Sequence, residues 1–189
     1  TQITNIITDK FDLNCKILPM SDNLVSTKIK TSNGKLLDFQ EYFVELKSEP
    51  EISDVIYSES EKADITMEVS NALDQADKIV VGPSNPILSI GPILAIQNLK
   101  EKLTNNSSTY VVSPFIENKA IKGPSKKNFE DLGYKSDITG IKEFYNNIGN
   151  YYIVQSGDTD KAENTIEKNI LFKSTEDSTN LARYIVDHE

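Results

Sequence analysis

The sequence predicts an α/β fold in which a mostly parallel sheet forms three layers with helices on both of its faces, joined by an antiparallel hairpin. After Asp77, short apolar strands alternate with helical segments, the arrangement of βαβ units. Earlier in the chain, Asn33-Gly34 joins two runs rich in β-branched and aromatic residues, which is a strong hairpin signal. A chain of 189 residues is long enough for one domain of this kind.

The first part of the chain is expected to hold the hairpin and two helices. The elements expected there are an amphipathic helix over 3–11, a strand end at 16–20, hairpin strands over 24–31 and 36–46, a strand over 53–57, and a helix over 67–76 capped by Thr66. The hairpin is expected to lie within the main sheet or beside it.

The second part of the chain is expected to form the parallel sheet. Strands are expected over 78–81, 110–113, 151–155 and 170–173, and helices over 93–103, 125–132, 138–148, 161–168 and 176–186. Gly133 fits a helix C-cap, and Asp137 fits the N-cap of the next helix. Parallel sheets bind ligands beyond the carboxyl ends of their strands, where two loop segments are expected, after 78–81 and after 110–113.

Composition argues against several classes of protein. The net charge of −9 disfavours a general nucleic-acid binder, and no apolar run approaches the length of a membrane span. A lone Cys15 rules out an internal disulfide and suits a reducing compartment. We therefore expect a cytoplasmic protein with no nucleic-acid or membrane partner, and the sequence leaves a homodimer open.

The segment GPSNPILSIGPIL at 82–94 is the strongest candidate for a ligand-binding loop. Its prolines fix the backbone, its glycines allow N–H groups to approach a ligand, and its side chains can hydrogen-bond. A helix that follows it would turn its positive end toward an anion. A stiff connection that binds nothing is the alternative. The candidate substrate-binding residues here are Gly82, Pro83, Ser84, Asn85, Pro86, Ser89 and Gly91.

Two further segments offer weaker candidates. In SPFIENKAIKGP at 113–124, Ser113 ends a strand, and Lys119 and Lys122 could bind phosphate, although they could also be surface charges. Residues 82–128 carry six lysines and two glutamates, a net charge of +4 in an acidic chain. Asp22 could bind magnesium, or it could only form a turn.

Five segments together resemble the 2-phospho-L-lactate transferase (CofD) family. These segments are LPMSDN at 18–23, FQEYFV at 39–44, ADKIVVGPSNPILSIGPIL at 76–94, VVSPFIENKAIKGP at 111–124 and DITGIKEFY at 137–145. Members of the family begin with a GGxGG strand-loop and a GDD-type acidic motif, which do not occur in this chain. The resemblance therefore implies that residues 1–189 are a single Rossmann-like domain from the C-terminal portion of a longer chain.

The resemblance also implies an activity. It implies a magnesium-dependent transfer of a 2-phospholactyl or phosphoenolpyruvyl group from lactyl- or enolpyruvyl-diphosphoguanosine to the deazaflavin Fo. GMP would be released, in a step of coenzyme F-420 biosynthesis. By the same resemblance the GPSNP and SIGP segments would bind the guanosine diphosphate side. The alternative is a related CofD-like protein that binds a nucleotide sugar and regulates without catalysis.

Overall fold

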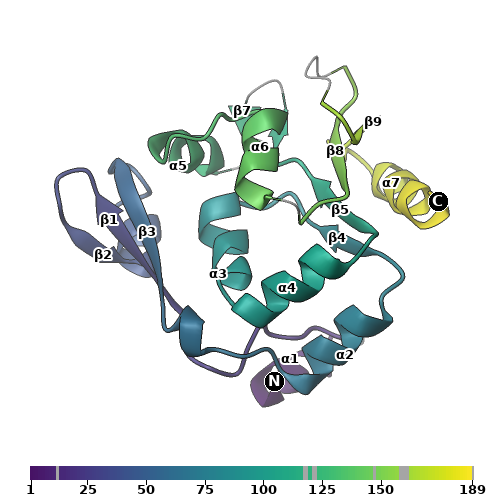
Figure 1. The fold of residues 1–189 in the computed structure, drawn as a ribbon, viewed down its shortest axis with the longest axis horizontal. Coiled ribbons are helices and arrows are strands. Elements are labelled where there is room, and N and C mark those ends of the chain that lie inside the picture. Colours follow the sequence, from purple (N-terminus) through teal and green to yellow (C-terminus); the bar gives the residue numbers. More distant parts are fainter. Residues whose placement is uncertain (12, 117–118, 121–122, 147, 158–161, 189) are drawn as a thin grey trace.

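The main sheet has four parallel strands in the order β4-β5-β8-β9. The computed structural model describes residues 1–11, 13–116, 119–120, 123–146, 148–157 and 162–188. The strands of the main sheet are β4 (Ile79–Val81), β5 (Thr109–Val112), β8 (Tyr151–Gln155) and β9 (Thr165–Lys168). Helices lie on both of its sides (Figure 1). The predicted fold class, Rossmann-like α/β, is confirmed.

The helices around the main sheet are mostly short and amphipathic. They are α2 (Met67–Gln75), α4 (Gln97–Asn105), α5 (Ser125–Asp131), α6 (Ile138–Tyr145) and α7 (Thr175–Asp187). As predicted, the side chains of Thr66 and Asp137 accept backbone hydrogen bonds at the starts of α2 and α6. Gly133 follows α5 with a φ of 85°, a conformation that favours glycine.

Alternation along the strands divides the sheet between two apolar clusters. Tyr110, Val112 and Ile153 face α7, which contributes Leu181 and Ile185. Val111, Tyr152 and Val154 belong instead to the larger cluster on the other face. Successive side chains of a strand point to opposite faces, so helices must cover both.

A separate antiparallel sheet contains the predicted hairpin. Its strands are β1 (Ser26–Thr31), β2 (Leu36–Asp38) and β3 (Ile52–Ser58), in the order β2-β1-β3. Figure 1 shows this small sheet separated from the main sheet by the segment that contains α3. The expected second hairpin strand over 36–46 is too long, because the chain turns after Asp38 into the π-helix η1 (Glu41–Glu45). That turn buries Tyr42 completely.

The segment predicted as a loop over 82–94 is mostly helical. A π-helix, η3 (Pro86–Ile90), begins only four residues after Gly82 and continues directly into α3 (Gly91–Leu94). The single helix expected over 93–103 is therefore interrupted, and α4 begins at Gln97. Only residues 82–85 remain as a connection.

Three other predictions need correction. Residues 165–168 form strand β9 beside β8, because hydrogen bonding to a buried neighbour outweighs the helix propensity of this charged segment. Residues 170–173 form no strand, although Ile170 is buried between the sheet and α7. Residues 16–20 form no strand either. The first helix, α1 (Gln2–Thr8), exists but its isoleucines are exposed.

Three short elements complete the described structure. They are the 3-10 turn η2 (Ser60–Lys62) and the paired strands β6 (Phe115–Ile116) and β7 (Lys119–Ala120). Within the described residues, no helix has the length and apolar character needed to cross a membrane.

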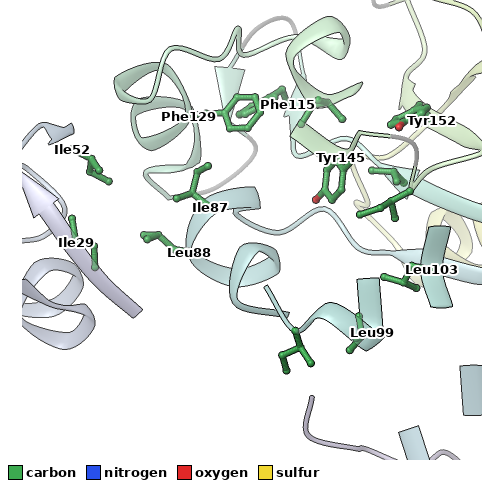
Figure 2. Close-up of a cluster of buried hydrophobic side chains, with 14 of the residues drawn as sticks. Ile29, Ile52, Ile87, Leu88, Leu99, Leu103, Phe115, Phe129, Tyr145 and Tyr152 are labelled. Carbon is green, nitrogen blue, oxygen red and sulfur yellow. The ribbon is translucent and has the colours of Figure 1, made fainter. Parts of the chain in front are cut away.

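One apolar cluster joins the two sheets. Ile29 and Ile52 of the small sheet and Leu88 of η3 belong to it, together with Val111 and Tyr152 of the main sheet. Figure 2 shows Leu88 reaching from η3 toward the small sheet. The helical segment after β4 is therefore held between the two sheets.

Candidate functional site

A pocket of about 320 Å³ lies where the chain leaves the carboxyl ends of β4 and β5. Three segments that are distant in sequence line it, and we call it the candidate pocket. Its lining residues are Phe39, Phe43, Pro83, Ser84, Asn85, Leu88, Ser89, Pro114, Gly123, Pro124 and Ser125. Four of the residues predicted from sequence meet there: Pro83, Ser84, Asn85 and Ser89.

Asn85 has a structural role in this pocket. Its Oδ1 accepts hydrogen bonds from the backbone N–H groups of Ile87 and Leu88, both at 3.0 Å, so it caps the start of η3. Its Nδ2 donates to Oδ1 of Asn128, also at 3.0 Å. The side chain is thus held by the protein itself, and much of its hydrogen-bonding capacity is used before any ligand arrives.

A buried chain of hydrogen bonds continues from Asn128. Nδ2 of Asn128 donates to the Tyr42 hydroxyl at 2.7 Å, and that hydroxyl donates to the carbonyl of Ser48 at 3.2 Å. Asn128 and Tyr42 are both 0% exposed. Burial raises the pKa of Tyr42 to about 12, and the hydrogen bond from Asn128 partly opposes that rise. The chain of bonds links the same three segments that line the candidate pocket.

Several backbone donors of the predicted anion loop are used within the chain. The N–H of Ser84 bonds to the carbonyl of Gly82 at 2.8 Å, and the N–H of Ser89 bonds to the carbonyl of Asn85 at 3.0 Å. The N–H groups of Ile87 and Leu88 bond to the Asn85 side chain, as above. The start of η3 is therefore capped internally, which differs from a helix end that offers free N–H groups to a phosphate.

Four predicted residues of the two loops lie outside the candidate pocket. Pro86 is buried as the first residue of η3. Gly82 lines a different and apolar pocket beside α7. A Cβ at Gly91 would overlap the hydroxyl of Tyr57. Ser113 is 3% exposed, and its hydroxyl exchanges hydrogen bonds with the backbone of Phe115.

The structure describes only one of the two lysines predicted to bind phosphate. The backbone of Lys119 pairs with that of Ile116 in the β6-β7 hairpin. Lys122 lies outside the described residues. Their binding of phosphate stays a prediction.

The candidate pocket carries no formal charge on its described lining residues. Three lysines of the predicted positive segment form ion pairs elsewhere: Lys102 with Asp74, Lys126 with Glu130, and Lys127 with Asp131. These pairs neutralise part of the net charge of +4 that the sequence places between residues 82 and 128. The described surface of the pocket therefore suits a neutral group better than an anion.

The predicted metal ligand, Asp22, is exposed. Asp22 accepts a hydrogen bond from the side-chain hydroxyl of Thr1 at 2.9 Å. Across the described part of the chain, no three histidine, cysteine or acidic side chains cluster as a metal site would require. Binding of magnesium by Asp22 stays a prediction.

Sequence reasoning missed Phe39, Phe43, Tyr42 and Asn128 as parts of the site. A signal was present for the aromatic pair, because residues four apart on a helical turn lie side by side. The interpretation of residues 36–46 as a strand concealed that spacing. Asn128 had no signal, since only the tertiary structure brings it to Asn85.

A parallel sheet with helices on both sides and a pocket at the carboxyl ends of two of its strands defines a Rossmann-like α/β protein. The family model described as 2-phospho-L-lactate transferase CofD matches residues 1–184. The chain therefore belongs to the CofD family, as the segments at 39–44 and 76–94 indicated.

Proteins named 2-phospho-L-lactate transferase are similar to this chain along most of its length. The protein of Methanocaldococcus jannaschii is 35% identical over 182 residues, which are 93% of this chain and 58% of that protein. The protein of Methanococcus vannielii is 35% identical over 100% of this chain and 62% of its own length. The chain thus spans about three fifths of these relatives.

Solved structures confirm the fold alone. Protein BH3568 of Bacillus halodurans has a TM-score of 0.69 and 13% sequence identity, over 97% of this chain and 65% of that chain. A second structure of that protein, described as a member of the UPF0052 family, has a TM-score of 0.59 and 16% identity, covering 83% of this chain and 48% of the other. These identities are too low to carry function.

Proposed function

We propose that this chain is the donor-binding part of a transferase that moves a 2-phospholactyl or phosphoenolpyruvyl group from its guanosine diphosphate conjugate to Fo. GMP is the leaving group, and the product belongs to coenzyme F-420 biosynthesis. The observation that carries the proposal is the candidate pocket, in which FQEYFV supplies Phe39 and Phe43 beside Ser84 and Ser89 of GPSNPILS. Family membership supports the same activity.

The proposed reaction is a substitution at phosphorus. The ribityl hydroxyl of Fo forms a bond to the phosphorus that carries the lactyl group and loses its proton. The bond from this phosphorus to the bridging oxygen breaks, and that oxygen leaves with GMP. Within the candidate pocket, the hydroxyls of Ser84 and Ser89 are available to orient the bound conjugate, which is the positioning that such a reaction needs.

Magnesium enters the proposal as an ion bound chiefly by the diphosphate of the donor. Magnesium commonly uses only one or two protein carboxylates beside the oxygens of a substrate phosphate. Asp22 is the candidate for such a carboxylate in this chain.

The alternative is a CofD-like regulatory protein that binds a nucleotide sugar. The candidate pocket is compatible with this alternative too, because a binding pocket does not by itself require a reaction. Both proteins would use a pocket at the carboxyl ends of the strands. They differ in whether a chemical product forms.

The test uses the full-length protein with Fo, magnesium and lactyl-diphosphoguanosine. We expect GMP to be released in equal amount to a new phosphodiester, measured by chromatography and mass spectrometry. A reaction without Fo is the control, because hydrolysis alone would release GMP without the phosphodiester. Absence of turnover, together with tight binding of a uridine diphosphate sugar, would favour the regulatory protein.

A further inference from the structure

The candidate pocket has an aromatic wall. The rings of Phe39 and Phe43 have centroids 5.3 Å apart and planes 11° apart, so they form an offset parallel stack. Both residues line the pocket. Phe43 is 42% exposed, which is a large open area for an aromatic ring. A second planar ring can extend such a stack on a face that is open to solvent.

The rest of the lining combines apolar residues with polar residues that carry no charge. Ser84 and Ser89 are exposed, and Asn85 and Ser125 add further hydrogen-bonding groups. No described lining residue carries a formal charge. A ring with neutral donors and acceptors at its edge matches these walls better than an anion does.

We propose that the Phe39–Phe43 stack is the wall on which a planar heteroaromatic ring of the ligand binds, with its polar edge toward Ser84 and Ser89. This inference rests on the proposed function, in which both substrates carry such a ring: guanine in the donor and the deazaflavin in the acceptor. Stacking recognises the flat face of either ring. The hydroxyls recognise its edge.

The aromatic wall is held in place before the ligand binds. Tyr42 adjoins Phe43 in η1, and its buried hydroxyl accepts the hydrogen bond from Asn128 at 2.7 Å. Asn128 is bonded in turn to Asn85, which lies in the segment that carries Ser84. The aromatic wall and the hydroxyls of Ser84 and Ser89 are therefore held in fixed positions relative to each other, which lowers the entropic cost of binding.

The experiment measures equilibrium binding by calorimetry to the full-length protein. The probes are guanosine, riboflavin as a tricyclic ring with a ribityl chain, and ribitol as a molecule with no ring. The variants are Phe43→Leu, which removes the aromatic face, and Phe43→Tyr, which keeps it. Phe172→Leu is the matched control, because Phe172 is 48% exposed but lines the separate pocket beside α7.

We expect at least one ring probe to bind, and Phe43→Leu to weaken its affinity about 5- to 30-fold. Phe43→Tyr should stay within about twofold of the unaltered protein, and so should Phe172→Leu, because both leave the stack intact. The probe that loses affinity identifies the ring. Ring binding that is undetectable, or equally strong in Phe43→Leu, overturns the inference.

Failure of the inference and failure of the proposed function give different results. GMP release in the presence of Fo, measured on the same proteins, separates them. Turnover together with unchanged ring affinity in Phe43→Leu refutes the aromatic wall alone. Ring binding that depends on Phe43, without any turnover, supports the wall and refutes the transferase.

Discussion

Tyr42 and Asn128 give the pocket a fixed shape through buried hydrogen bonds. Each is 0% exposed, and a buried polar group that loses its partner costs the protein stability. Their bonds to each other, to Ser48 and to Asn85 avoid that cost only when η1, η3 and α5 lie in the observed arrangement. These groups thus favour one relative placement of the segments that line the pocket.

Replacing Tyr42 with Phe should lower the free energy of unfolding by about 1–3 kcal/mol near neutral pH, because Nδ2 of Asn128 loses its acceptor. The pKa of Tyr42 is raised from 10.0 to about 12, so its neutral form is favoured in the folded state. The unaltered protein should therefore lose stability as the pH rises through this window. Tyr42→Phe lacks this loss, and the difference between the two proteins should shrink with rising pH.

Urea unfolding followed by circular dichroism, at about pH 8 and about pH 11, measures the effect of Tyr42→Phe. Other tyrosines with a raised pKa, such as Tyr57, are present in both proteins, so their ionisation cancels in the difference. A difference in stability that does not change between the two pH values would contradict the raised pKa of Tyr42.

At the scale of elements, η3 shows how one set of residues supports two interpretations. Asn85-Pro86 is typical of a stiff loop, but it is also typical of a helix start, with asparagine as N-cap and proline as first helical residue. The structure has the helix start. Asn85 therefore stabilises η3, while Ser84 and Ser89 are left exposed toward the candidate pocket.

This assignment predicts different effects for two neighbouring substitutions. Asn85→Ala should lower the free energy of unfolding by about 1–3 kcal/mol, because two backbone donors and Asn128 lose a partner. Ser84→Ala, at an exposed site in the same connection, should change it by less than about 0.5 kcal/mol. Thermal or urea unfolding of both variants measures these changes in the free energy of unfolding. Equal losses of stability would show that Asn85 is not a structural cap.

At the scale of the whole molecule, the small sheet is fixed against η3 and α3 by close packing. The hydroxyl of Tyr57 on β3 donates to the carbonyl of Ile87 at 2.7 Å. The same hydroxyl lies over Gly91. A Cβ atom at position 91 would overlap this hydroxyl and would lie 3.2 Å from the carbonyl oxygen of Pro86. Glycine at 91 therefore permits the close approach of the small sheet to α3, and its predicted part in ligand binding stays untested.

Gly91→Ala tests this packing. Alanine usually stabilises a helix relative to glycine, but here the overlap with Tyr57 should destabilise the protein by about 1–3 kcal/mol. When Tyr57 is already replaced by alanine, Gly91→Ala should cause much less destabilisation, because the overlapping atoms are gone. A double-mutant cycle by urea unfolding measures the coupling. Losses that simply add would contradict the contact between Tyr57 and Gly91.

The sequence by itself determined the features that depend on local pattern. Strands 79–81, 109–112 and 151–155, the hairpin at Asn33-Gly34 and the caps at Thr66 and Asp137 follow from periodicity and turn chemistry. Four members of the candidate pocket followed from the segment at 82–94. The order of five segments also identified the family.

Only the tertiary structure decided the features that depend on distant partners. Residues 165–168 became a strand because β8 offered a ladder, and residues 41–45 became a π-helix that buries Tyr42 against Asn128. The aromatic wall of the pocket follows from that turn. Contacts between residues far apart in the chain leave no periodic signal, so the sequence indicated part of the lining of the candidate pocket but not the side chains that complete it.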